Sequence, residues 1–289
     1  MSDYGHLSRQ ATLASIIVAV ILIVTKTWAY WATGSVSLLG SLLDSFLDGI
    51  TSFINFVALR YALIPADEDH KFGHGKLESI AALAQSAFMI GSAFVLVLNS
   101  FDVMIDKRQV VNSQWGVYVS ILAIILTIAL VMFQKYVLSK TKSLIVEADS
   151  LHYQGDILMN GAVLLAMIMA SIGVFWVDSV MALFIGIFLC VNAWRVGSKA
   201  FEDLMDMQLP EVEQRIHELV TKAGGSEGCH DVRCRQSGPN MFIQFHLELD
   251  ETLALWSAHE IGDRIEKNII NEYPYADVLI HHDPVKVIP

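Results

Sequence analysis

Four ionisable residues lie at matching intervals within two apolar segments of this 289-residue chain. Asp48 follows Asp44 by four residues in one segment. Asp156 follows His152 by four residues in another. This spacing places each pair on one face of a helix. Three carboxylates and one imidazole need a compensating positive charge, which a divalent cation supplies. These ligands suit tetrahedral Zn²⁺, and they also admit Fe²⁺, Mn²⁺ or Cd²⁺ because no thiolate is present to exclude harder ions.

Two alternatives to a metal site remain open for these residues. An ionisable group deep in a bilayer costs several kcal/mol unless it is paired or hydrated, so such groups usually mark ion paths. A polar network that merely locks helices together is one alternative, and two matched pairs fit it poorly. A proton channel without metal is the other, although it would not require the four-residue pairing.

A second group of ligand types follows the first carboxylate pair. Asp67, His70 and His74 are separated by three and four residues, so a helical turn or compact loop brings them together. We predict a loop site in which a water molecule completes three protein ligands. The alternative is a solvated charged loop that binds nothing.

The C-terminal part holds six of the ten histidines: His217, His230, His246, His259, His281 and His282. His246 lies on the polar side of an expected strand, and His230 opens the strand before it. A sheet edge would gather these residues with His281 and Asp283 into one or two metal centres, with Asp283 bridging. His259 begins a helix and could reach this cluster, whereas His217 is expected on the surface. The alternative is six ordinary surface histidines.

The composition indicates a membrane protein. Hydrophobic residues make up 54% of the chain and charged residues only 17%, whereas soluble domains have roughly 25% charged residues. Three cysteines are too few for a disulfide framework. The net charge of −11 argues against nucleic acid as a partner. No phosphate-binding G-x-x-x-x-G-K-[ST] motif is present, so a nucleotide is not the direct energy source.

Six segments are long enough to span the ~30 Å hydrocarbon core as helices. They are residues 12–32, 36–61, 78–105, 115–138, 144–172 and 176–200. Basic residues gather on one side of these spans, which the positive-inside rule makes cytoplasmic, together with both termini. That side collects Arg9, Arg60, Lys71, Lys76, Lys135, Lys140, Lys142, Arg195 and Lys199, and the other side has Lys107 and Arg108.

Residues 208–289 differ from residues 1–207 and form a soluble tail with 14 acidic and 7 basic residues. The pattern predicts a small α+β domain of order αββαβ. Its expected helices cover 211–222 and 256–272, and its expected strands cover 231–236, 241–249 and 276–282. A domain of about 80 residues is marginal in size, so dimerisation would help to stabilise it.

These motifs resemble the cation diffusion facilitator family, most closely its bacterial zinc- and ferrous-iron-exporting members. The resemblance covers nearly the whole chain and includes the Phe72-Gly73-His74-Gly75-Lys76 string. It implies Zn²⁺/H⁺ antiport by a homodimer in the bacterial inner membrane, with a metallochaperone-like cytoplasmic domain. It implies that Asp44 broadens selectivity to Cd²⁺ and Fe²⁺.

The resemblance also implies metal ligands outside the spans. It makes Asp67, His70 and His74 a loop site, and it leaves a ligand role for His282 undecided. In the tail it implies a two-metal site made of His230, His246, His259, His281 and Asp283.

The sequence therefore predicts a secondary active transporter rather than an enzyme. A membrane metal sensor without transport is the main alternative. A membrane metallohydrolase is less suited, because four protein ligands leave no open zinc position. Lys76 and Asp206 are expected near cytoplasmic span ends, where a charge pair between them could fix the spans at the start of the tail.

Overall fold

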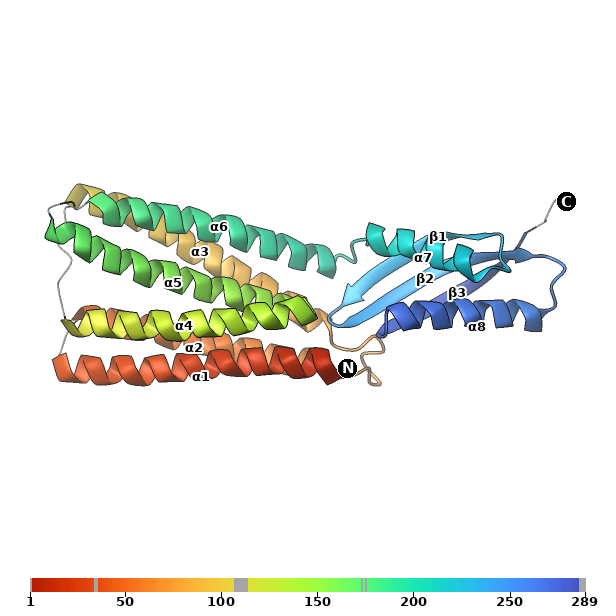
Figure 1. Cartoon of the computed structure of the whole chain (residues 1–289), viewed down its shortest axis with the longest axis horizontal. Helices are drawn as coiled ribbons and strands as arrows, with labels where there is room; N and C mark the ends of the chain where they lie inside the picture. The colour runs from red at the N-terminus through yellow and green to blue at the C-terminus, as the bar shows by residue number, and fades with distance from the viewer. Residues whose placement is uncertain (1, 34–35, 107–113, 173, 175, 286–289) are drawn as a thin grey trace.

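The computed structural model describes residues 2–33, 36–106, 114–172, 174 and 176–285. Within them, six long helices form a bundle, and the remaining elements form a separate layer beyond one end of it (Figure 1). The bundle helices are α1 (Ser2–Thr33), α2 (Val36–Ala62), α3 (Lys76–Asp106), α4 (Gln114–Thr141), α5 (Leu144–Ser171) and α6 (Trp176–Leu204).

These six helices correspond to the six predicted spans. Five helices in the described part of the chain are long and apolar enough to cross a membrane: α1, α2, α3, α4 and α6. Helix α5 has the same length as α4 but carries Glu147, Asp149 and Asp156. Its place among the other five, rather than its hydropathy, makes it the sixth span (Figure 1). Lys107 and Arg108, expected on the non-cytoplasmic side, lie outside the described residues.

The tail has the predicted order αββαβ. Its elements are α7 (Pro210–Ala223), β1 (Gly228–Ser237), β2 (Asn240–Asp250), α8 (Leu255–Glu272) and β3 (Ala276–Val285). Strands β1 and β2 form the expected antiparallel hairpin, and β3 pairs parallel to β2 on its other side. All three strands extend beyond the predicted limits, because polar end residues such as His230 and Asp283 also join the ladder.

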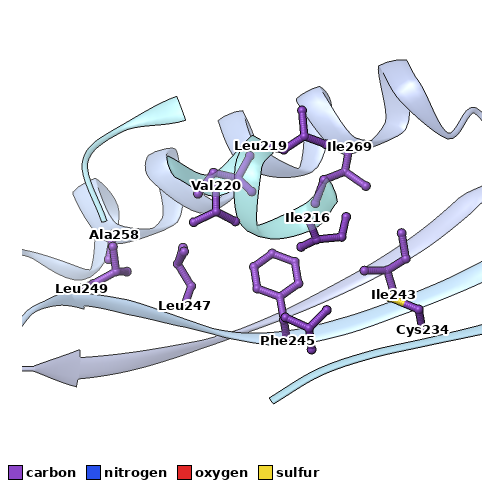
Figure 2. Close-up of a cluster of buried hydrophobic side chains, with 12 residues drawn as sticks. Ile216, Leu219, Val220, Cys234, Ile243, Phe245, Leu247, Leu249, Ala258 and Ile269 are labelled. Atoms are coloured by element: carbon purple, nitrogen blue, oxygen red, sulfur yellow. The ribbon is translucent and has the colours of Figure 1, made fainter. Parts of the chain in front are cut away.

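One face of this sheet packs against α7 and α8. The alternating residues Ile243, Phe245, Leu247 and Leu249 of β2 are buried there. They meet Ile216 and Val220 of α7 and Ile269 of α8 (Figure 2). Pro210 begins α7, and two glycines with positive φ, Gly224 and Gly225, end it. The opposite face of the sheet is thereby left for the polar side chains.

Strand β1 contains a bulge between His230 and Arg233. His230 pairs with His246 and Arg233 pairs with Gln244, so β1 has one residue more than β2 over this stretch. Asp231 takes up the extra length with a φ of 50°, a conformation that Asp adopts more readily than most residues. The bulge keeps His230 on the polar face while Val232 and Cys234 enter the core.

The bundle and the tail meet at the loop between α2 and α3. A Cβ atom on Gly75 would lie 2.2 Å from the backbone oxygen of Ser237, so only glycine fits against this turn of the tail. The Arg235 guanidinium lies over the rings of Phe72 and Phe242, at 4.8 and 5.0 Å from their centroids. Such stacking of a cation on aromatic faces is attractive. The Phe72-Gly73-His74-Gly75 segment is therefore a docking surface as well as a carrier of possible ligands.

Candidate metal centres

The intramembrane cluster comprises Asp48 of α2 with His152 and Asp156 of α5. His152 Nε2 lies 2.9 Å from Asp48 Oδ1 and 3.9 Å from Asp156 Oδ2. One ligand atom from each residue lies within 4.8 Å of the others. Asp44 lies one turn before Asp48 on α2 but is not part of this group. The structure thus gathers three of the four predicted ligands.

A buried network holds the two ligand helices together. Asp149 of α5, with 1% of its surface exposed, accepts hydrogen bonds from Asn55 of α2 at 3.1 Å and Gln134 of α4 at 2.8 Å. Ser15 of α1 bonds to the same carboxylate at 2.6 Å. The hydroxyls of Ser52 in α2 and Tyr153 in α5 are 2.9 Å apart. These bonds fix α5 against three neighbouring helices, next to the intramembrane cluster.

Lys26 is a further charged residue of this region. Its ammonium group donates to the backbone oxygen of Ser41 at 3.0 Å and to Ser45 Oγ at 2.6 Å. No partner for Lys26 was predicted from the sequence, although its position in an otherwise apolar run was an available signal.

The loop cluster comprises Asp67, His70 and His74. Asp67 Oδ1 lies 3.3 Å from His70 Nδ1, and Asp67 Oδ2 lies 3.6 Å from His74 Nε2. The backbone N–H of His70 donates to Asp67 at 2.7 Å and is the main cause that lowers the pKa of Asp67. The cluster therefore keeps its carboxylate ionised. His74 Nδ1 is buried and has no partner among the described contacts.

The tail cluster comprises His230, His246, His281 and Asp283. His246 pairs with both His230 and His281 across the three strands, so the histidines form a row over the polar face. Asp283 lies at 2.8 Å from His246, 3.1 Å from His281 and 3.4 Å from His230. Hydrogen bonding to His246 is the main cause that lowers the pKa of Asp283. The cluster runs across the sheet, whereas we expected it at an edge.

Three other histidines of the tail lie apart from this cluster. His259 is on α8 with its Nε2 3.5 Å from Asp263, and it is not among the ligands that lie together with His230, His246 and Asp283. His282 points to the helix side, because a Cβ on Gly262 of α8 would lie 2.7 Å from its Nε2. His217 lies on α7, 3.2 Å from Cys229 Sγ. Glu248, which the sequence did not suggest, lies 3.0 Å from His230.

A chain of ion pairs joins the bundle to the tail. Lys76 of α3 lies 3.0 Å from Asp206, which follows α6, and Asp206 lies 3.1 Å from Arg235 of β1. Partial burial raises the pKa of Asp206, but the bonds from Lys76 and Arg235 outweigh it and leave that pKa lowered. The expected pair of Lys76 and Asp206 is present. Through Asp206 it also connects to Arg235 of the tail.

Comparison with known proteins agrees with this architecture. A family model described as the cation efflux transmembrane domain matches residues 12–205. A second model, described as the cytoplasmic domain of cation efflux proteins, matches residues 209–285. The chain belongs to the cation efflux family. This confirms the predicted family and the prediction of a transporter rather than an enzyme, and it makes the chain a multi-pass membrane protein.

Individual relatives cover the chain almost completely. Cation-efflux pump FieF of Cronobacter sakazakii is 45% identical over 99% of this chain and 96% of its own length. Cation-efflux pump FieF of Escherichia coli (strain K12 / DH10B) is 46% identical with the same coverage. A solved structure described as the zinc form of a putative zinc transporter, CzrB, is 29% identical, covers 27% of this chain and 92% of that chain, and has a TM-score of 0.26.

Proposed function

We propose that the protein exports Zn²⁺, and also Cd²⁺ and Fe²⁺, from the cytoplasm in exchange for protons. The transport site consists of Asp44, Asp48, His152 and Asp156. The observation that supports it most strongly is the approach of Asp48 and His152 to 2.9 Å between two membrane helices. Imidazole and carboxylate ligands without a thiolate accept this range of divalent ions.

Exchange follows from competition for the same atoms. A metal ion binds deprotonated carboxylates and a neutral imidazole nitrogen, so its arrival displaces protons. Protons that arrive from the other membrane face displace the metal in turn. Asp44 supplies the fourth protein ligand, because it shares a helix face with Asp48 one turn away. An inward flow of protons then drives metal outward as the site alternates between the two faces.

The other two clusters bind metal without transporting it. We assign the loop cluster one ion with a water molecule as fourth ligand. We assign the tail site two ions held by His230, His246, His281 and Asp283, together with His259, which would have to approach the row from its place on α8. The working unit is a homodimer in the bacterial inner membrane with both termini in the cytoplasm. The acidic tails of two protomers repel each other, and bound cations offset this repulsion.

Zinc flux in proteoliposomes with an imposed pH gradient tests the proposal. We expect flux that rises with the gradient and is lost in Asp48→Ala, while the variant elutes and melts like the parent protein. His217→Ala, in a histidine outside the three clusters, is the matched control and keeps its flux. Flux that ignores the gradient contradicts the proton exchange. Saturable zinc binding without any flux would instead indicate a sensor.

A further inference from the structure

Lys26 places a positive charge inside the membrane-spanning part of α1. Only 6% of the residue is exposed, in a helix whose neighbouring residues are mostly apolar. A lysine at such a position is costly unless polar groups receive its hydrogen bonds. Ser41 and Ser45 of α2 accept them, and this fixes the position of the ammonium group.

The bonds of Lys26 hold it beside the proposed transport ligands. Ser45 directly follows Asp44 and lies three residues before Asp48 in α2. The ammonium group lies close enough to Asp44, Asp48 and Asp156 to interact electrostatically with each of them. Among the contacts of the described residues, however, it donates to Ser41 and Ser45 and not to a carboxylate. The ligand oxygens therefore stay open to a metal ion.

We propose that Lys26 is a built-in counter-charge that weakens metal binding at the transport site and so promotes metal release. The inference rests on the transport site proposed above. While the site is empty, the ammonium charge partly offsets the carboxylates. When a metal ion binds, the same charge repels it.

Coulomb's law shows which bound ion this charge repels more strongly. The energy scales with the product of the charges, so a divalent ion is repelled twice as strongly as a proton at the same place. Lys26 therefore weakens the binding of a metal ion more than the binding of any single proton. A purely structural role of the lysine, by contrast, predicts that its loss loosens the site and weakens metal binding.

The opposite signs of these two expectations allow a direct test. Zinc affinity is titrated against a chelator in a background with His70→Ala and Asp283→Ala, which removes ligands of the loop and tail clusters. The pH is the same for every variant and stays below the range in which a lysine loses its charge. Lys26→Met should bind zinc about ten-fold or more tightly, as expected when a nearby like charge is removed. In proteoliposomes the same variant should show a lower apparent KM and a lower maximal flux.

Two further variants control the result. Lys26→Arg retains the charge and should bind zinc like the background protein. If Lys26→Met does not fold, Lys26→Gln carries the same expectation, since it retains a donor for Ser41. Unchanged or weaker zinc binding in the folded neutral variant overturns the inference. Asp48→Ala in the same background separates the two proposals: if it still binds zinc, the transport site itself is refuted, and if it does not, only the role of Lys26 is at stake.

Discussion

The intramembrane cluster and the tail cluster use the same residue types in different surroundings. In the first, only 19% of the Asp48 side chain and 15% of the His152 side chain are exposed. In the second, His230 and His281 are 47% and 67% exposed. Burial makes uncompensated charge costly, which fits the proposal that protons replace the metal ion at the first cluster. In the tail, water stabilises the charges whether or not a metal is bound, which suits a resident ion.

A pair of matched substitutions gives the largest expected effect. Asp48→Asn and Asp283→Asn each remove one carboxylate charge and keep the side-chain shape. We expect Asp48→Asn to reduce zinc flux at least 100-fold, because it would remove a proposed charged ligand of the transported metal ion that also binds protons in the proposed exchange. Asp283→Asn should reduce metal content of the tail and change flux only a few-fold.

Vesicle flux and the metal content of the purified variants measure this difference. The comparison between the two clusters would fail if Asp283→Asn stopped transport as completely as Asp48→Asn. In that case the tail metal would belong to the transport path.

A substitution in the tail core tests whether the tail is stabilised separately from the bundle. Phe245 is 1% exposed within the core of Figure 2, and a buried Phe→Ala change costs about 3–5 kcal/mol in free energy of unfolding. Phe245→Ala should therefore unfold the tail at lower denaturant concentration and leave zinc binding by the intramembrane cluster in place. Leu279→Ala, at a residue that is 61% exposed, is the control and should have little effect. Simultaneous loss of both metal sites in Phe245→Ala would mean that the bundle depends on the tail.

The contact between the loop and the tail can be disrupted at Gly75. The Gly75→Ala methyl group would lie 2.2 Å from the oxygen of Ser237, so the tail must shift away from the loop. We expect a larger distance between spin labels on the two domains and flux reduced several-fold. Gly91→Ala is the matched control, because nothing lies within 4 Å of the added carbon. An unchanged label distance in Gly75→Ala would show that this contact is not maintained.

The smallest effect is expected for the pair of Lys76 and Asp206. Their side chains are 28% and 42% exposed, so a double-mutant cycle should give a coupling of about 1 kcal/mol or less. The lowered pKa of Asp206 sets the pH range. The contribution is complete above the ordinary Asp value of about 3.9 and is lost only as pH falls through the lower folded value. Equal coupling at pH 7 and pH 5, measured by chemical denaturation, is the expected result.

Most of the fold was predicted from the periodic spacing of apolar residues. The spans, the tail order and the hairpin all follow from apolar spacing and turn residues, which act locally. The four-residue pairs, together with the need to compensate their charges, led us to predict that the two pairs meet. The structure brings Asp48, His152 and Asp156 together and leaves Asp44 outside this group. The sequence could not predict that the three histidines form a row across the sheet, because this depends on the parallel pairing of β2 with β3 and on a bulge in β1. These residues are His230, His246 and His281.

Several features that depend on packing between distant segments were not predicted. The bonds of Asp149 to α1, α2 and α4 are one such feature, because they depend on how the helices pack. The roles of Lys26 and Arg235 depend in the same way on which neighbours they meet. His282 faces the helices because successive strand residues alternate and His281 lies on the polar face, and Gly262 of α8 leaves room for its ring there.

The bulge at Asp231 determines the sidedness of a whole strand. Successive residues of a strand point in opposite directions, so removing one residue reverses every side chain on one side of the deletion. Without Asp231, either the imidazole of His230 would face the helices, or Val232 and Cys234 would face water. One residue with an unusual backbone conformation thus reconciles a hydrophobic interior with a row of histidines on the other surface.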